Sequence, residues 1–329
     1  MNHSNSGGSN PVLLGGYNFG FNQNSTDLTG SHFKDPVLVS AIAINGLCVV
    51  AFLALAIVTC CMKLSWKAKG RKVFAVLYGL VVAMFLAYGR TLADEIIHEL
   101  GLSSVVGPYL ALPILKQVFA NATDTILIFV LYSVIKNRSK HLRPGTKDYA
   151  QAQRLHEGTW LLIFLFGIAD EGLFFYSLTY VESGDIDPAK ALNIVNWYKD
   201  IHLSYVTIYC AITLEIFIRS VMIWHEARQK QKQSLISNIL IRMITPFLLI
   251  RSLSNVALSV IYISLGREEE KSTAVVTGVL LGLTSVVLYV GLVVIAFEKD
   301  WDMPKIPNIS GGTNLAYDAD NEASREPFP

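Results

Sequence analysis

The sequence predicts an all-α membrane protein, a bundle of seven transmembrane helices with its N-terminus outside the cytosol and its C-terminus in the cytosol. Of its 329 residues, 52% are hydrophobic and only 16% are charged, whereas soluble domains carry about a quarter charged residues. Seven apolar stretches each reach the roughly 20 residues that a helix needs to cross a hydrocarbon core about 30 Å thick. Lysine and arginine are concentrated in alternate loops between these stretches, which indicates the orientation.

Each apolar stretch is expected to form one helix, because backbone amides in lipid must find their partners within the same segment. The residue alternation typical of barrel strands is absent. The first and last stretches are almost free of charge, whereas the second, third, fifth and sixth contain ionisable residues. The predicted spans are Pro36–Met62, Val73–Leu92, Val106–Ile135, Thr159–Val181, Ile201–Trp224, Ile236–Leu265 and Thr273–Phe297.

The first, third and fifth loops carry most of the basic residues, and cytosolic loops are the ones enriched in lysine and arginine. The loop between Glu182 and Asp200 is instead acidic, as expected of the opposite side. The basic loops are predicted to contact anionic lipid or a cytosolic partner. Their residues are Lys63, Lys67, Lys69, Arg71 and Lys72, then Lys136, Arg138, Lys140, Arg143, Lys147 and Arg154, and finally Arg228, Lys230 and Lys232.

Three regions follow from these patterns: a polar tail over residues 1–35, a membrane domain over 36–297, and a disordered cytosolic tail over 298–329. The first tail lacks the basic start and apolar core of a secretory signal, so the first helix is expected to direct its own insertion. Asn24 begins an Asn-Ser-Thr glycosylation pattern. Chance explains that pattern equally well in a tail rich in asparagine and serine.

Ionisable residues inside the spans are the main candidate functional residues. Each costs about 2.5–3.5 kcal/mol at the centre of a membrane helix, so such residues persist when they are paired or line a wet cavity. They therefore form either a polar pocket for a ligand or a set of ion pairs that fixes helix register. The candidates are Arg90, Asp94, Lys116, Asp124, Asp170, Glu171, Glu215, Arg219, Arg242 and Arg251.

Spacing predicts which of these residues share a helix face. Residues four apart face the same side, residues eight apart lie about two turns apart on one broad face, and adjacent residues point about 100° apart. Two ion pairs are therefore predicted within helices, Arg90 with Asp94 and Glu215 with Arg219. Lys116 and Asp124 are predicted to lie on one face of their helix. Asp170 and Glu171 are predicted to contact different partners.

Two prolines are candidate hinges. The ring of Pro246 clashes with the carbonyl of Arg242 in a regular helix, so a kink there is expected to turn Arg242 and Arg251 toward the interior. Pro113 is expected to act in the same way on the third span. Depth in the membrane then predicts two pairs between helices, Asp170 with Arg251 and Glu215 with Arg242.

Several function classes find no support in the sequence. The last span has no lysine for a retinal Schiff base, and the seven histidines show no metal-ligand spacing. Phosphate-binding glycine loops, nucleophile elbows and HExxH are absent, so an enzyme, a cofactor and a metal site are not expected. A net charge of +1 offers no field for nucleic acid.

The segment Pro246-Phe247-Leu248-Leu249-Ile250-Arg251 resembles the Pro-Phe-Leu-x-x-Arg segment of a family of fungal integral membrane proteins with seven helices and no assigned function. More loosely, the chain is similar to fungal seven-helix proteins of the RTA-like group, which is associated with lipid translocation, and to receptor-like proteins of plant pathogens. Ser252-Leu253 and Asn255 depart from the family pattern, which has an aromatic residue after the arginine. The resemblance implies a fungal multipass membrane protein of the plasma membrane or another secretory-pathway membrane, without a substrate.

Two functions therefore remain open beside a purely structural role. The first is a receptor or sensor that binds a small lipophilic ligand among the helices and moves the sixth helix. The second is a transporter that moves a lipid or another small molecule along the buried charges. A closed outer pocket would favour the sensor, and a continuous polar track would favour the transporter.

Overall fold

The structure is a computed structural model that describes residues 33–61, 72–100, 111–142, 148–182, 187–230, 235–265 and 275–298. Within these ranges the chain is helical and contains no strand. Seven of the described helices are long and apolar enough to cross a membrane. This confirms the predicted all-α fold of seven spans and the multipass character of the chain. Asn24 and the predicted cytosolic tail after Glu298 lie outside the described residues.

The sixth and seventh spans are each divided by segments of π-helix, in which backbone hydrogen bonds join residues five apart. The helical segments are α1 (Pro36–Cys61), α2 (Lys72–Glu99), α3 (Ala111–Leu142), α4 (Asp148–Glu182), α5 (Pro188–Gln229), α6 (Leu235–Ile239), η2 (Leu240–Ile244), α7 (Thr245–Leu258), η3 (Ser259–Ser264), η4 (Gly278–Leu283) and α9 (Thr284–Phe297). We call α6, η2, α7 and η3 together helix six, and Val275–Phe297 helix seven.

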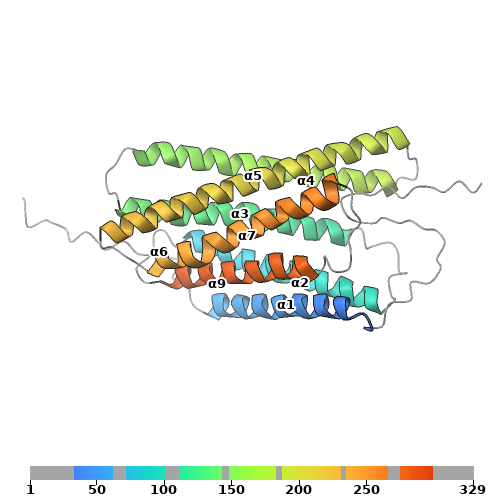
Figure 1. The fold of residues 1–329 in the computed structure, drawn as a ribbon, viewed down its shortest axis with the longest axis horizontal. Coiled ribbons are helices and arrows are strands. Elements are labelled where there is room, and N and C mark those ends of the chain that lie inside the picture. Colours follow the sequence, from blue (N-terminus) through green and yellow to red (C-terminus); the bar gives the residue numbers. More distant parts are fainter. Residues whose placement is uncertain are drawn as a thin grey trace, which may run out of the picture.

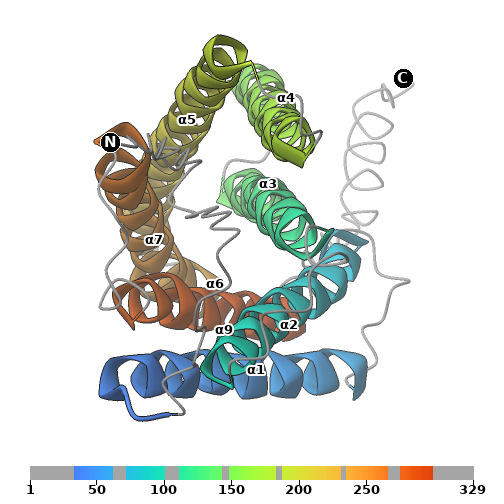
Figure 2. The ribbon, with the colours of Figure 1, turned by 90° about the vertical axis from the view of Figure 1, so that its right-hand side faces the viewer.

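Successive spans run in opposite directions, so the bundle has two ends, which we name after the two ends of α1. The Pro36 end lies on the right in Figure 1 and the Cys61 end on the left. Seen from the Pro36 end in Figure 2, α2, α3, α4, α5, α7 and α9 are arranged in a ring. The same view shows α1 crossing obliquely over the outside of α2 and α9.

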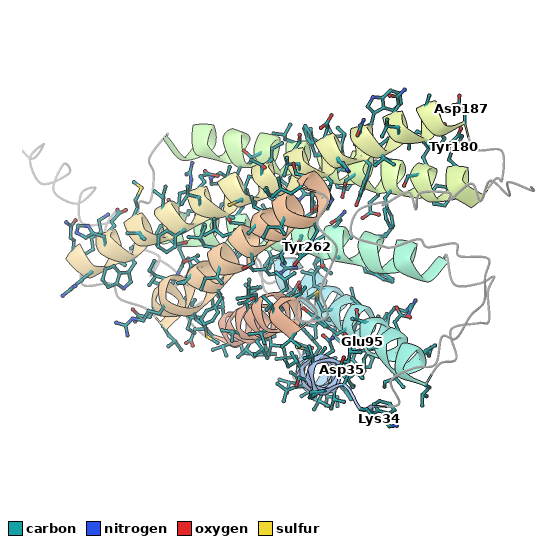
Figure 3. The ribbon with its side chains drawn as sticks, turned by 45° about the vertical axis from the view of Figure 1, so that its right-hand side comes forward. Lys34, Asp35, Glu95, Tyr180, Asp187 and Tyr262 are labelled. Atoms are coloured by element: carbon teal, nitrogen blue, oxygen red, sulfur yellow. The ribbon has the colours of Figure 1, made fainter. Side chains whose placement is uncertain are left out.

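The helix that contains the fifth span begins much earlier than the sequence predicted, at Pro188 rather than Ile201, and α5 is 42 residues long. The cause is a local start signal. The Asp187 side chain accepts a hydrogen bond from the Ala189 N–H at 3.0 Å, and proline suits the first helical position. The Asp187 N–H donates to the Tyr180 hydroxyl at 3.1 Å. Figure 3 shows these two residues side by side, where α4 and α5 meet.

Pro246 does change the geometry of helix six, through a wider turn that precedes it. Proline has no N–H, and its ring excludes the carbonyl of residue 242 from the usual position. In η2 the backbone shifts to five-residue spacing, and the Thr245 N–H donates to the Leu240 carbonyl. Such π-helical turns occur often at functional sites. Pro113, in contrast, is the third residue of α3 and lies in its first turn, where proline is tolerated without a kink.

Candidate functional site

A cavity of about 390 Å³ lies inside the bundle and is lined by residues from α1, α2, α3, α5 and helices six and seven. Such a volume lies within the roughly 300–1,000 Å³ typical of small-molecule sites. The wall combines apolar side chains with charged and polar groups. The polar lining residues are Asn45, Tyr88, Thr91, Glu95, Asn121, Asp124, His202, Tyr205, Arg251, Asn255, Ser259 and Thr277.

The cavity belongs to the half of the bundle near the Pro36 end. On α3 it is lined by Ala120, Asn121 and Asp124, whereas the apolar core residues begin at Leu127 and continue toward the Cys61 end. On the other lining helices too, the cavity-lining residues lie nearer the Pro36 end than most of the buried apolar core residues. The fully buried core residues of the Cys61 half include Leu127, Ile128, Leu131, Val134, Ile216, Ile236, Leu240, Ile244, Leu248, Leu288, Leu292 and Ile295.

The central ion pair of the cavity joins α3 to helix six. Arg251 Nη1 donates to Asp124 Oδ1 at 2.5 Å, and both side chains are more than nine-tenths buried. The predicted pair of Arg251 with Asp170 is therefore wrong. Depth alone could not decide between Asp124 and Asp170, and the packing of α3 in the ring places Asp124 against Arg251. Arg251 Nε is buried and has no hydrogen-bond partner within the described residues.

Asp170 and Glu171 share one partner, contrary to the prediction. The Asn121 amide nitrogen donates to Asp170 Oδ2 at 3.0 Å and to Glu171 Oε1 at 2.6 Å. The prediction failed because the carboxylates point apart on their helix, but the amide of α3 lies between them. Asn121 carries no charge, and nothing in the sequence marked it as a site residue.

His202 was also missed by sequence reasoning, which placed it near a helix end. Since α5 begins at Pro188, His202 lies a few turns inside the helix and on the cavity wall. Its Nδ1 lies 3.0 Å from Asp170 Oδ1, and its Nε2 lies 3.3 Å from Ser259 Oγ. A chain of polar contacts thus connects α4, α5 and helix six.

A second polar cluster lies nearer the Cys61 end, around Glu215. The predicted pair of Glu215 with Arg219 is present, with Arg219 Nε donating to Glu215 Oε1 at 2.6 Å. The Tyr132 hydroxyl donates to Glu215 Oε2 at 2.5 Å, and the Tyr132 ring stacks on His156 at 4.2 Å between ring centroids. This cluster holds α3, α4 and α5 together.

Arg242 takes no part in that cluster, so the predicted pair with Glu215 is wrong. Its side chain is exposed, and no carboxylate of the described chain forms an ion pair with it. The turn η2 absorbs the effect of Pro246 locally, and Arg242 remains on the outer surface of helix six.

Of the remaining sequence candidates, Arg90 and Asp94 are described with their side chains, and Lys116 is not. Arg90 and Asp94 form the predicted ion pair on α2, near Glu95, whose Oε1 accepts from the Asn45 amide at 2.7 Å. The backbone of Lys116 is helical and belongs to α3, but its side chain lies outside the described parts of the chain. In those parts, no group of three or more His, Cys, Asp or Glu residues is arranged to hold a metal ion.

No protein-family model, curated protein or solved structure matches this chain.

Proposed function

We propose that this protein is a seven-helix receptor or sensor that binds a small amphipathic ligand in the cavity near the Pro36 end. The observation that carries the proposal is the position of the cavity, which lies in the Pro36 half of the bundle and is bordered by charged and polar side chains. The cavity combines apolar wall with hydrogen-bonding groups, the usual composition of a ligand site. In the proposed orientation the Pro36 end faces away from the cytosol, so the ligand arrives from that side.

The Cys61 half argues against the alternative of a transporter. A translocated polar group needs partners along its whole path, because unsatisfied polar groups in an apolar interior cost several kcal/mol. Beyond Asp124 and Arg251 the described core is mainly leucine, isoleucine and valine. Its buried polar groups form separate clusters, such as the Thr213–Ser252 hydroxyl pair and the contacts around Glu215. A continuous polar track would therefore form only if the helices moved apart in the Cys61 half and opened its apolar core.

Helix six provides the connection from the cavity to the Cys61 end. Arg251, Asn255 and Ser259 line the cavity, and the same helix continues through Pro246 and η2 into α6. A ligand that contacts Arg251 would bias the position of this helix, since a ligand shifts an equilibrium by its differential affinity for two states. The basic loops of the Cys61 end then remain the proposed contact for a cytosolic partner.

Cysteine accessibility tests the proposal. In a background lacking Cys48, Cys60, Cys61 and Cys210, we would introduce Asn255→Cys at the cavity wall and Leu248→Cys in the buried core. A membrane-impermeant, positively charged methanethiosulfonate is then applied to intact cells or to inverted vesicles. We expect Asn255→Cys to react only from the outside of the cell and Leu248→Cys to react from neither side.

Reaction of Asn255→Cys from both sides would contradict the receptor proposal, because alternating access is the property of a transporter. Reaction only in inverted vesicles would contradict the proposed orientation. Lipid scrambling by wild-type proteoliposomes, lost in Arg251→Ala, would favour translocation over sensing. A positive test is a thermal-shift screen of small molecules in which stabilisation by a hit disappears in Asn255→Leu, a variant that removes no described hydrogen bond.

A further inference from the structure

Three polar residues of α4, α5 and helix six lie in the order carboxylate, imidazole, hydroxyl, and the imidazole and the hydroxyl line the cavity. Figure 2 shows α5 between α4 and α7, so the imidazole comes from the middle helix of the three. From this arrangement we infer that Asp170, His202 and Ser259 form a hydrolytic site for small carboxylic esters inside the membrane domain. This inference does not depend on the receptor proposal.

The connectivity of the imidazole matches what a serine nucleophile requires. A carboxylate must hold Nδ1–H so that the Nε2 lone pair faces the hydroxyl. Here Nδ1 lies 3.0 and 3.2 Å from the two Asp170 oxygens, and Nε2 lies 3.3 Å from Ser259 Oγ. A serine–histidine contact of this length is common before substrate binds.

Asp170 has the environment of a positioning residue. Its side chain is fully buried, so it does not meet a substrate directly. The Asn121 amide donates to its Oδ2 at 3.0 Å, which fixes the plane of the carboxylate while both oxygens remain close to His202. The carboxylate thereby holds the imidazole in one tautomer and compensates the charge that forms when Nε2 takes a proton.

Ser259 differs from other serines of the membrane helices. Ser252, Ser254 and Ser285 donate their hydroxyl to a backbone carbonyl three or four residues earlier, as helical serines commonly do. Ser259 Oγ makes no such bond within the described chain, and its one hydrogen-bonding contact there is His202 Nε2. It is the first residue of η3 and lines the cavity. The hydroxyl is therefore available for attack.

Groups that stabilise a developing oxyanion stand on the same helix. Asn255 precedes Ser259 by four residues, so both lie on one face, and both line the cavity. The Asn255 amide has no hydrogen-bond partner within the described chain, and Arg251 Nε is likewise unpartnered. An amide or guanidinium donor directed at the substrate carbonyl oxygen is the usual electrostatic contribution in acyl transfer.

The reaction balances with water as the only co-reactant. Ser259 Oγ bonds to the ester carbonyl carbon while its proton moves to His202 Nε2. The carbon–oxygen bond to the leaving alcohol then breaks, and that alcohol takes the proton from Nε2. Water next attacks the acyl-serine, gives one proton to Nε2, and Ser259 recovers it as the carboxylic acid leaves. The products are one acid and one alcohol.

The cavity sets the substrate class. Met84, Val206 and Leu281 supply apolar wall beside the polar groups, which suits short acyl and alkyl chains. A volume of about 390 Å³ restricts the site to small esters.

A fluorescent alkyl fluorophosphonate tests the inference on the full chain purified in nanodiscs. The probe forms an Oγ–phosphorus bond with an activated serine and releases fluoride, so labelling reports the nucleophile without knowledge of the substrate. We expect an adduct on Ser259 by peptide mass spectrometry, and hydrolysis of 4-nitrophenyl butyrate. His202→Ala should slow labelling by about 10²–10⁴-fold, the usual contribution of a general base.

Ser259→Ala should abolish labelling, whereas the matched control Ser254→Ala on the same helix should label like the wild type. A cooperative unfolding transition first shows that the wild-type protein is folded. If that folded protein forms no adduct on Ser259, the inference is overturned, whether or not the variants fold. Labelling that persists in Ser259→Ala, or is equal in His202→Ala and the wild type, would overturn it too. In those cases the three residues only hold α4, α5 and helix six together.

Discussion

The two halves of this bundle are built from the same seven helices but differ in the side chains that they bury. Near the Cys61 end, aliphatic side chains fill the interior, and the polar cluster around Glu215 lies within one group of three helices. Near the Pro36 end, charged and polar groups from nearly every helix surround a cavity. In the proposals above, the Cys61 half maintains the fold and the Pro36 half carries the binding and the chemistry.

The largest effect is expected at the ion pair that separates the halves. Arg251→Met leaves Asp124 as an unpaired buried charge, which costs about 3–5 kcal/mol of unfolding free energy. The double variant Asp124→Leu with Arg251→Met should recover most of this loss, because two apolar residues of similar volume replace the pair. Thermal unfolding in detergent micelles measures both variants. If Arg251→Met alone and the double variant lost the same unfolding free energy, the unpaired charge of Asp124 would not be the cause of the loss.

The next comparison tests the packing of the two halves directly. Ile216→Ala truncates a fully buried residue of the core and should cost about 3 kcal/mol. Val206→Ala removes part of a wall that already faces a cavity, so it should cost only about 1 kcal/mol. Denaturant titration of the two variants measures the difference. Equal costs would contradict the division into a packed half and a hollow half.

A smaller effect is expected where helix seven meets the wide turn of helix six. A Cβ added at Gly291 would lie 2.8 Å from Ile244 Cγ1, so Gly291→Ala should cost about 2 kcal/mol by overpacking. Combination with Ile244→Ala should cost less than the sum of the two single variants. Gly46→Ala, where nothing lies within 4 Å of the new Cβ, is the control. Strict additivity would show that this contact does not hold η2 in place.

The smallest effect is expected at Arg242. Its side chain is exposed on the outside of helix six, about two turns from the Cys61 end of the helix, so it can extend to the membrane surface without a partner in the bundle. Arg242→Ala should therefore have the same unfolding free energy as the wild type. Glu215→Gln should lower the unfolding free energy by the same amount in the wild type and in the Arg242→Ala variant. A large cost for Arg242→Ala alone would restore Arg242 to the network around Glu215.

The sequence determined the number of spans, because the length of an apolar run is a local property with one solution in lipid. It also determined the pairs Arg90–Asp94 and Glu215–Arg219, because residues four apart on a helix must be neighbours. The start of α5 was also signalled locally, by Asp187 and Pro188, but the hydropathy of the following segment concealed it.

Only the tertiary structure decided which polar residues on different helices contact one another. Arg251 meets Asp124 rather than Asp170, and Asn121 joins two carboxylates that spacing had separated. His202 and Ser259 carry no motif, so the absence of a hydrolase signature did not exclude their meeting. Contacts between helices depend on rotation and tilt within the ring, which residues far apart in the chain fix together. No stretch of sequence encodes that rotation by itself, whereas each stretch encodes its own helix.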